Sequence, residues 1–230
     1  MNLIEYPGLK AYPGRGVILG AVPDGRALAA YFLMGRSMNS QNRVLVPDGN
    51  GLRAEAFDPA KLVDPSLIIY APVRVLGRRL IVTNGDQTDT IHDFLSRGES
   101  FEAALATREY EPDAPNWTPR ISGLLTASDG AFHYQLSILK RGAGCERFFF
   151  RYEAPKPGLC HLIHTYQPGA NLLKPFSGEP VALDVDLSPE KLARALWAAL
   201  DPVNRVALFV RAVDPVTFQF EDHIINALEA

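Results

Sequence analysis

The chain has 230 residues, few cysteines, no long apolar run and little net charge, and each shortage excludes a class of protein. Its net charge of −3 argues against a protein that coats nucleic acid or membranes. No apolar run reaches about 18 residues, so no transmembrane helix is predicted. A basic stretch followed by an apolar one is missing at the start, so no secretory signal is expected. We therefore expect a cytoplasmic protein without a nucleic-acid or membrane partner.

The only two cysteines, Cys145 and Cys160, flank a proline-rich turn at 154–158. The runs 147–152 and 161–166 on either side are predicted to pair as a hairpin. That pairing would separate the two sulfurs by about 25 Å along the ladder. We therefore expect no disulfide, in agreement with a reducing cytoplasm.

Motifs for metal binding and nucleophilic catalysis are also missing. His161 and His164 would point to opposite faces of a strand, so they are not expected to share a metal ion. The chain has no Gly-x-Ser-x-Gly elbow, Walker loop or His-Glu-x-x-His motif. The phenylalanine run 148–150 favours sheet core or an oligomer contact over base stacking.

Apolar runs separated by turn residues predict strands over much of the chain. The predicted hairpins are 16–22 with 27–34, 43–46 with 52–57, 67–75 with 79–83, and 120–127 with 131–140. A buried strand is predicted at 206–213.

Helical patterns occur at four places. One helix is predicted at 88–97 and a second, capped by Ser100, reaches residue 108. Ser188 followed by Pro189 predicts the start of a third, with an apolar stripe formed by Leu192, Leu196, Trp197 and Leu200. A short helix is predicted at 222–228.

This order of elements, with many hairpins and few strand–helix–strand units, predicts an α+β fold with mainly antiparallel sheets. Two sheets packed together and covered by helices would bury the apolar strands. We expect one domain spanning residues 1–230.

The segment 31–43 is the most informative for function. An apolar strand ends at Gly35 and is followed by Arg36 and Arg43, whose guanidinium groups suit phosphate. Ser37 and Asn42 add neutral hydrogen-bonding groups. The alternative is a polar connection with surface arginines.

Three further segments carry candidate site residues. Arg15 lies between two glycines, where backbone amides can approach a ligand or simply form a turn. The loop 84–89 joins a strand to a helix start, which suits an anion, or it is a turn with a cap. Glu111 and Asp113 are acid/base candidates in a loop that is otherwise a solvated connection, and Arg120 is a further phosphate candidate.

Taken together, these segments resemble the archaeal-type IMP cyclohydrolase family. The resemblance is carried by Tyr12–Gly16, by Gly35–Ser37 with Ser40 and Asn42–Arg43, by Asn84–Asp86 with Thr88–Asp89, and by Thr118–Ile121. It is clear from about residue 12 to 123 and weaker beyond.

The resemblance implies an N-terminal-nucleophile-hydrolase-like fold, an αββα sandwich. It implies closure of the purine ring of 5-formamido-4-carboxamidoimidazole ribonucleotide to IMP and water, with no metal or organic cofactor, and a homo-oligomer. The chain begins Met1-Asn2 and so offers no Thr, Ser or Cys as a terminal nucleophile. Ring closure needs none, because the substrate carboxamide nitrogen is the nucleophile.

The resemblance suggests roles for eleven residues. The proposed catalytic residues are Arg36, Tyr70 and Glu111, with Arg36 and Arg43 holding the phosphate or the developing oxyanion. The proposed substrate-binding residues are Arg15, Ser37, Asn42, Arg43, Asn84, Gly85, Asp86 and Arg120.

The chain departs from the family pattern beside Tyr70, where archaeal members carry Tyr-Asn-Cys and this chain has Ala71 and Pro72. Two alternatives to an IMP cyclohydrolase therefore stay open. One is a diverged protein that binds purine nucleotides without turnover. The other is an amide hydrolase whose nucleophile is exposed by processing.

Overall fold

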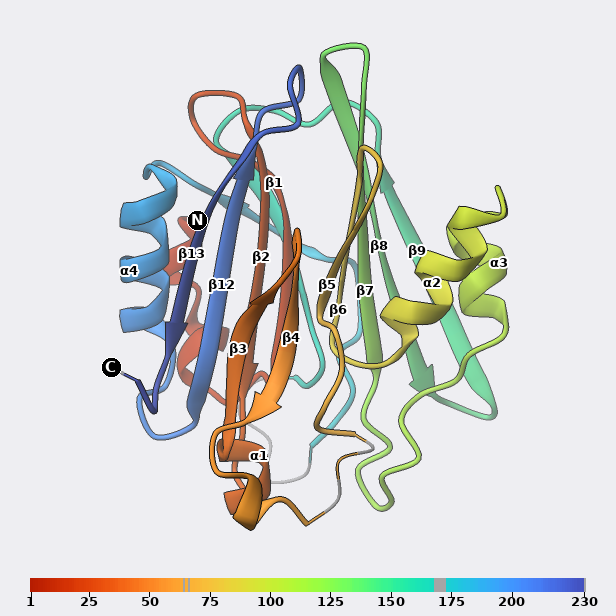
Figure 1. Cartoon of the computed structure of the whole chain (residues 1–230), viewed down its shortest axis with the longest axis vertical. Helices are drawn as coiled ribbons and strands as arrows, with labels where there is room; N and C mark the ends of the chain where they lie inside the picture. The colour runs from red at the N-terminus through yellow and green to blue at the C-terminus, as the bar shows by residue number, and fades with distance from the viewer. Residues whose placement is uncertain (64, 66, 168–172, 230) are drawn as a thin grey trace.

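In the computed structural model, which describes residues 1–63, 65, 67–167 and 173–229, two antiparallel sheets pack face to face (Figure 1). Within those residues the first sheet has six strands in the order β11-β10-β1-β2-β12-β13. Its strands are β1 (Arg15–Ala21), β2 (Ala27–Met34), β10 (Leu159–His164), β11 (Val181–Asp184), β12 (Arg205–Val213) and β13 (Phe220–Asn226).

The second sheet, with seven strands in the same described part of the chain, is a meander from β3 to β9 in sequence order. Its strands are β3 (Arg43–Asp48), β4 (Gly51–Ala56), β5 (Val73–Leu76), β6 (Arg79–Thr83), β7 (Arg120–Ser128), β8 (Ala131–Arg141) and β9 (Cys145–Tyr152). The four hairpins predicted from turn residues are confirmed, β1/β2, β3/β4, β5/β6 and β7/β8.

Helices cover the two outer faces, which gives the order helix, sheet, sheet, helix (Figure 1). Helix α4 (Pro189–Ala199) packs on the six-stranded sheet, and α2 (Gln87–Ser96) with α3 (Phe101–Ala106) packs on the seven-stranded sheet. The short α1 (Met38–Gln41) follows β2, and single 3₁₀ turns occur at Leu3–Glu5, Pro7–Lys10 and Pro59–Lys61. The α+β class with two antiparallel sheets, predicted from the sequence, is confirmed.

The main core lies between the sheets. Leu19 and Tyr31 from one sheet meet Val82, Leu125 and Leu136 from the other, and all five side chains are fully or almost fully buried. Residues of opposite parity on β1 and β2, such as Ile18 and Phe32, pack instead beneath α4. Both faces of these central strands are therefore apolar, which explains their uninterrupted hydrophobic runs. None of the helices in the described part of the chain is long and apolar enough to cross a membrane.

The predicted hairpin between 147–152 and 161–166 is wrong, because its two strands belong to different sheets. β9 pairs with β8, whereas β10 pairs with β1 and β11. Pro155 and Pro157 lack the amide protons of a tight hairpin, and the segment between the strands crosses from one sheet to the other. Cys145 and Cys160 are both free, as expected, although the hairpin assumed in predicting this does not exist.

Two other predicted elements are wrong. Residues 67–72 do not extend β5, because the amides of Ile68 and Ile69 both bond to the Pro65 carbonyl and Pro72 has no amide proton for the ladder. In place of the helix predicted at 222–228, residues 222–226 belong to β13, which pairs along its whole length with β12, and a turn follows. The β-branched Ile224 and Ile225 favour a strand once the edge of β12 is available.

The helix ends agree with the sequence only in part. The Ser100 hydroxyl caps α3 at 3.0 Å from the Ala103 amide, as predicted, but α3 ends at residue 106. Ser188 precedes α4 without a side-chain capping bond. Of the predicted α4 stripe, the three leucines are buried and Trp197 is partly exposed. In the 148–150 run Phe149 packs edge-on against Phe101, while Phe148 is 41% exposed.

The close approach of the sheets predicts a cost for adding one methyl group at Gly123. A Cβ there would lie 2.8 Å from Leu19 Cδ1 and 3.0 Å from Val17 Cγ1 across the core. We expect Gly123→Ala to lower the free energy of unfolding by about 1–3 kcal/mol in urea titrations. Gly144→Ala, which would contact nothing within 4 Å, is the control. Equal urea midpoints for the two variants would contradict this packing.

Candidate functional site

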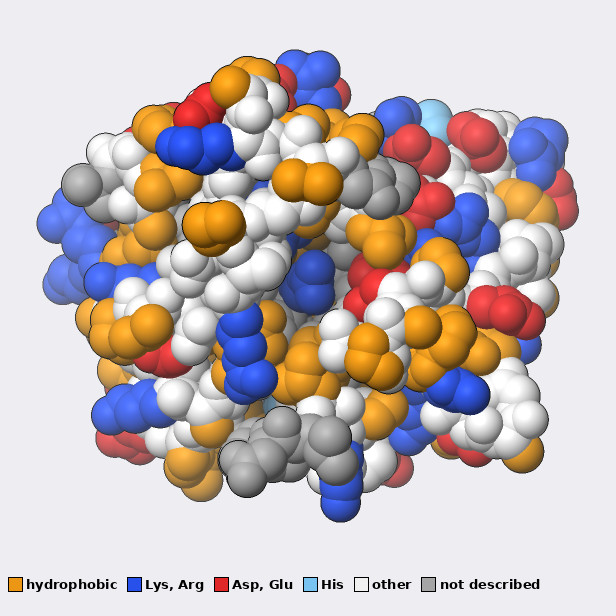
Figure 2. All heavy atoms as spheres, turned by 90° about the horizontal axis from the view of Figure 1, so that it is seen from below, with side chains coloured by type: hydrophobic (Ala, Val, Ile, Leu, Met, Phe, Trp, Pro, Cys, Tyr) orange, Lys and Arg blue, Asp and Glu red, His pale blue; other side chains and the backbone are white. Residues whose placement is uncertain are grey.

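A cleft of about 440 Å³ opens at the end of the molecule that carries α1. Figure 2 views this end and shows the surface hollowed near its centre, with basic side chains in the hollow and acidic ones on its wall. The lining comes from the start of β1 and the segment before it, the β2–α1 connection with α1, the segment before β5 at Leu67 and Ile68, the loop 109–119 and the segment after β10. Residues far apart in the chain therefore meet here, including Arg15, Arg36, Ser37 and Glu111.

Arg15 is placed in the cleft by the glycines on both sides of it. At Gly14, where φ is +79°, a Cβ would lie 2.2 Å from the Thr165 hydroxyl oxygen. At Gly16 a Cβ would lie 2.2 Å from the Phe32 ring. No side chain fits at either position, so the start of β1 can pack closely against its neighbours and direct Arg15 inward.

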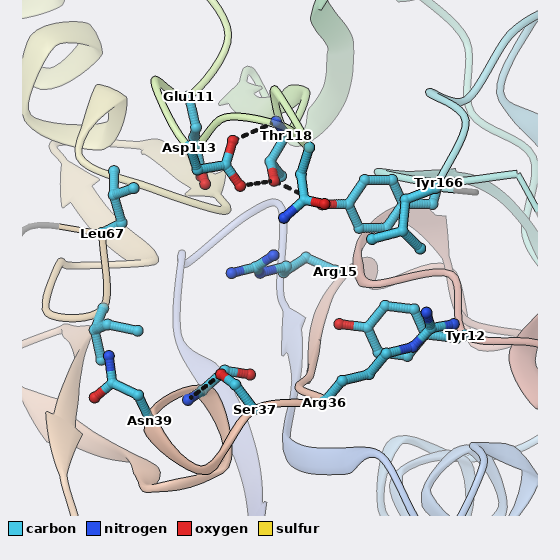
Figure 3. Close-up of a pocket in the computed structure, with 14 residues that line it drawn as sticks. Tyr12, Arg15, Arg36, Ser37, Asn39, Leu67, Glu111, Asp113, Thr118 and Tyr166 are labelled. Atoms are coloured by element: carbon cyan, nitrogen blue, oxygen red, sulfur yellow. Dashed lines mark hydrogen bonds between the residues drawn. The ribbon is translucent and has the colours of Figure 1, made fainter. Parts of the chain in front are cut away.

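The Arg15 guanidinium points into the middle of the cleft (Figure 3). Within the described part of the chain its buried Nε has no hydrogen-bond partner. Burial opposes its charge, but the facing Glu111 carboxyl, with Tyr70 and Tyr166 nearby, outweighs burial and raises its pKa. A guanidinium held in this way is poised for an anionic or carbonyl ligand.

Glu111 lies on the opposite wall and is 3% exposed. Its backbone amide donates to the Thr118 carbonyl at 2.8 Å, which fixes the loop that carries it. Burial raises the pKa of Glu111 to about 7, against the opposing charges of Arg15 and Arg120, and the Asp113 carboxylate adds to the rise. A carboxyl group with this pKa can both take and give a proton near neutral pH.

Arg36 and Ser37 form the wall opposite Glu111, next to α1 (Figure 3). The Arg36 guanidinium lies over the Tyr12 ring, 3.9 Å from its centroid. The Ser37 hydroxyl accepts a hydrogen bond from the Ser40 amide at 3.1 Å and so caps α1. Both side chains are exposed, which leaves the Arg36 donors accessible from the cleft mouth.

Arg43 and Tyr70 lie behind the cleft lining. Arg43 is fully buried, and its Nε donates to the Ser40 carbonyl at 2.8 Å. Its Nη1 and Nη2 have no partner among the residues the structure describes. Burial lowers the pKa of Arg43, Tyr70 opposes the shift and the Arg15 charge adds to it. The Tyr70 hydroxyl bonds to that of Tyr31 at 2.7 Å, within the core.

A second buried group supports the Glu111 wall from behind. Arg120 pairs with Asp86 at 2.6 Å and donates to the Gln87 side chain at 2.8 Å. Arg108 is a further partner of Asp86. A Cβ at Gly85 would lie 2.7 Å from Arg120 Nη1 and 3.4 Å from Glu111 Oε1, so only glycine fits between them.

The two candidate asparagines hold backbone rather than line the cleft. The Asn84 side chain donates to the Pro119 carbonyl at 2.9 Å and accepts from the Ile121 amide at 2.8 Å. The Asn42 side chain bonds the Asp58 carbonyl and amide, both at 2.8 Å. Asn84 therefore fixes the start of β7, which carries Arg120, and Asn42 fixes the start of β3, which carries Arg43.

Of the eleven residues singled out in the sequence, four line the cleft, Arg15, Arg36, Ser37 and Glu111. Tyr70, Arg43, Arg120, Asn42, Asn84, Gly85 and Asp86 lie behind or beside it. The structure adds Tyr12, Thr118 and Tyr166 to the lining. Tyr12 and Thr118 belong to segments that carry a sequence signal, whereas Tyr166, which follows β10, lies in none of the motifs described above.

Comparison with known proteins gives a single answer. The family model described as "IMP cyclohydrolase-like protein" matches residues 12–217. The IMP cyclohydrolase of Methanopyrus kandleri is 34% identical over 159 residues, 67% of this chain and 75% of that protein. That of Methanococcus maripaludis strain C7 is 33% identical over 128 residues, 54% of this chain and 62% of that protein. That of Methanocaldococcus jannaschii is 28% identical over 120 residues, 51% and 58% respectively. In these last two comparisons the match spans less than two thirds of the relative.

The raised pKa of Glu111 predicts a pH-dependent stability. The folded protein holds a proton on Glu111 up to about pH 7, whereas the unfolded chain releases it near its ordinary pKa of 4.5. The folded state thus binds more protons between these values, and the free energy of unfolding falls as pH rises through this window. Glu111→Gln removes the titration, so its stability relative to wild type should be roughly 2–3 kcal/mol greater at pH 8 than at pH 5.

Urea unfolding of both proteins at the two pH values measures this double difference. Glu190→Gln, on the exposed face of α4, is the control: it removes a surface ion pair with Arg194, and its difference from wild type should be small and the same at both pH values. A Glu111→Gln difference that is the same at pH 5 and pH 8 would contradict the raised pKa.

Proposed function

The chain belongs to the family of IMP cyclohydrolase-like proteins, and from that premise we propose that it is an IMP cyclohydrolase. It closes the ring of 5-formamido-4-carboxamidoimidazole ribonucleotide, giving IMP and water. The observation that carries this proposal is that Arg15 and Glu111, whose pKa is about 7, face each other across a cleft of about 440 Å³. A cation and a carboxyl group that can exchange protons are the two groups that the reaction needs.

The reaction forms one C–N bond and expels one water molecule. The carboxamide nitrogen attacks the formyl carbon, the formyl oxygen gains charge and takes up a proton, and the nitrogen loses one. The resulting hydroxyl group then takes up a second proton and leaves as water, while the formamido nitrogen loses its proton and the ring gains its C=N bond. Holding the two substituents in contact contributes up to roughly 7–11 kcal/mol to such an intramolecular step.

Glu111 is the proposed acid/base group. Its carboxylate form accepts a proton from the attacking nitrogen, and its acid form returns a proton to the leaving hydroxyl group. Both forms are populated near pH 7 because of its raised pKa. Arg15, in the middle of the cleft, stabilises the formyl oxygen as it gains charge.

Arg36 and Ser37 are proposed to bind the phosphate on the opposite wall, near the cleft mouth. Stacking on Tyr12 holds the Arg36 guanidinium flat and leaves its donors free. Arg43 is assigned to the positive potential behind Arg15, because its guanidinium is within electrostatic reach of Arg15 and Glu111 and two of its buried nitrogens have no partner among the described residues. Arg120, Asp86, Gly85, Asn84 and Asn42 then support the binding residues, and Tyr70 stays behind the lining, where its hydroxyl bonds to that of Tyr31.

Ala71 and Pro72, the departure from the family pattern, are absent from the described lining of the cleft. This supports the enzyme over a diverged protein that only binds nucleotides. We also propose that the helix–sheet–sheet–helix layers are those of the N-terminal-nucleophile-hydrolase-like fold. The same proposal includes one domain over residues 1–230, a cytoplasmic location and a homo-oligomeric state.

Replacing Arg36 tests the phosphate assignment. Arg36→Ala should lower kcat/KM for ring closure at least tenfold, mainly through KM, because the phosphate is not a reacting group. The change in absorbance on ring closure measures it. Arg194→Ala, on exposed α4, is the control. An unchanged kcat/KM would remove Arg36 from the site.

Replacing Glu111 tests the acid/base assignment. Glu111→Gln preserves the size of the side chain but cannot exchange a proton, so kcat should fall by about 10²–10⁴. Circular dichroism should show an unchanged fold. If kcat stays within a few-fold of wild type while the nucleotide still binds, the proton passes through another group.

A further inference from the structure

A chain of two side-chain hydrogen bonds, joined by a third bond from a backbone amide, runs along one wall of the cleft and ends on a carboxylate (Figure 3). The Tyr166 hydroxyl bonds to the Thr118 hydroxyl at 2.6 Å, and the Thr118 hydroxyl donates to Asp113. The other Asp113 oxygen accepts from the Thr118 amide at 2.6 Å. All three residues line the cleft, but the role proposed above for Glu111 and the arginines does not use them.

The direction of each bond follows from counting protons. An ionised carboxylate only accepts, and both Asp113 oxygens accept from Thr118. The Thr118 hydroxyl has a single proton, which it gives to Asp113. It can therefore only accept from Tyr166, so the Tyr166 proton is committed to Thr118. The Tyr166 hydroxyl can therefore act toward a ligand only as a hydrogen-bond acceptor, through the lone pair of its oxygen.

Tyr166 is held firmly in this orientation. Its amide donates to the Pro13 carbonyl at 3.1 Å, and its ring stacks on Tyr12 with centroids 6.2 Å apart. The side chain is 2% exposed, and burial raises its pKa to about 12, so it keeps its proton at neutral pH. At such a buried site, bulk water cannot readily donate to the Tyr166 oxygen in place of a ligand. A ligand that offers no donor therefore leaves this oxygen unsatisfied, which costs binding free energy.

We infer that Tyr166 is a specificity-determining residue whose hydroxyl oxygen accepts a hydrogen bond from the carboxamide N–H of the substrate. The inference rests on the proposed function, since it takes an imidazole ribonucleotide as the ligand. Thr118 and Asp113 are positioning residues: they do not touch the ligand but fix the Tyr166 hydroxyl as an acceptor.

This arrangement distinguishes a carboxamide from a carboxylate. The two groups have nearly the same shape, but a carboxamide carries N–H donors and an ionised carboxylate carries none. A carboxylate placed against the Tyr166 oxygen meets a lone pair and leaves it unsatisfied. A site built to pair with a substrate N–H strongly disfavours an analogue that lacks it. The attacking amide would also be oriented before the bond forms.

The experiment uses two unreactive probes, 5-amino-4-carboxamidoimidazole ribonucleotide and its 4-carboxylate analogue. Titration calorimetry gives the ratio of their dissociation constants, carboxylate over carboxamide, for each protein. Because the Arg15 cation attracts the carboxylate in every variant, the change in the ratio is the readout. Thr118→Val keeps the shape and the Tyr166 hydroxyl but frees its proton to donate, and Tyr166→Phe removes the oxygen.

In Thr118→Val and Tyr166→Phe the ratio should fall about tenfold from the wild-type value. Thr126→Val, on β7 away from the cleft, should keep the wild-type ratio, and thermal unfolding should show all variants folded. A wild-type ratio in folded Thr118→Val would overturn the inference, as would failure of the wild type to bind either probe. If the ratios of dissociation constants change as predicted but the wild type does not turn over the formamido substrate, only the proposed function is overturned.

Discussion

The charges of Arg15, Arg43 and Glu111 at one end of the two sheets are the constraint on which the site depends; Arg43 and Glu111 are buried, and Arg15 is partly buried. A buried ion is costly unless it is paired or changes its protonation state. Glu111 does the latter, with a pKa of about 7 despite its cationic neighbours. Arg15 and Arg43 keep their charge, and parts of both guanidinium groups have no partner among the described residues. The protein thus maintains a positive recess that an anionic ligand would neutralise.

Two rigid parts of the fold hold these charged side chains in place. On one side, β1 and β2 lie in the middle of the six-stranded sheet, and both their faces are covered by apolar side chains. On the other, the Arg120–Asp86 pair and the Asn84 bonds fix the ends of β6 and β7, from which the Glu111 wall is built. The ends of the strands fix the positions of the charged residues, and only short loops separate these residues from the strands.

Much of this could be predicted from the sequence, and the exceptions have physical causes. Hairpins such as β1/β2 were predictable because turn residues and apolar runs are local signals. The partners of β9 and β10 could not be predicted, because turn residues and apolar runs do not show which sheet a strand will join. The local pattern of the C-terminal segment predicts a helix. The segment forms a strand because it pairs with the edge of β12, and that pairing cannot be read from a local pattern.

The candidate site shows the same limit. Arg36 and Arg15 are predictable because one follows an apolar strand and the other lies between glycines, and Glu111 is an acid/base candidate by its residue type in a charged loop. Arg43 was singled out as a phosphate ligand, but its depth below the cleft could not be read from a pattern that gives charge and not burial. Tyr166 gave no signal, since its importance lies in a hydrogen bond to Thr118, 48 residues away.

A crystal structure with bound IMP tests the central claim most directly. The account predicts the purine between Arg15 and Glu111, with C2, the former formyl carbon, toward the Arg15 guanidinium and the phosphate against Arg36 and Ser37. A nucleotide bound at another surface, or one in this cleft whose base makes no contact with Arg15 or Glu111, would contradict it.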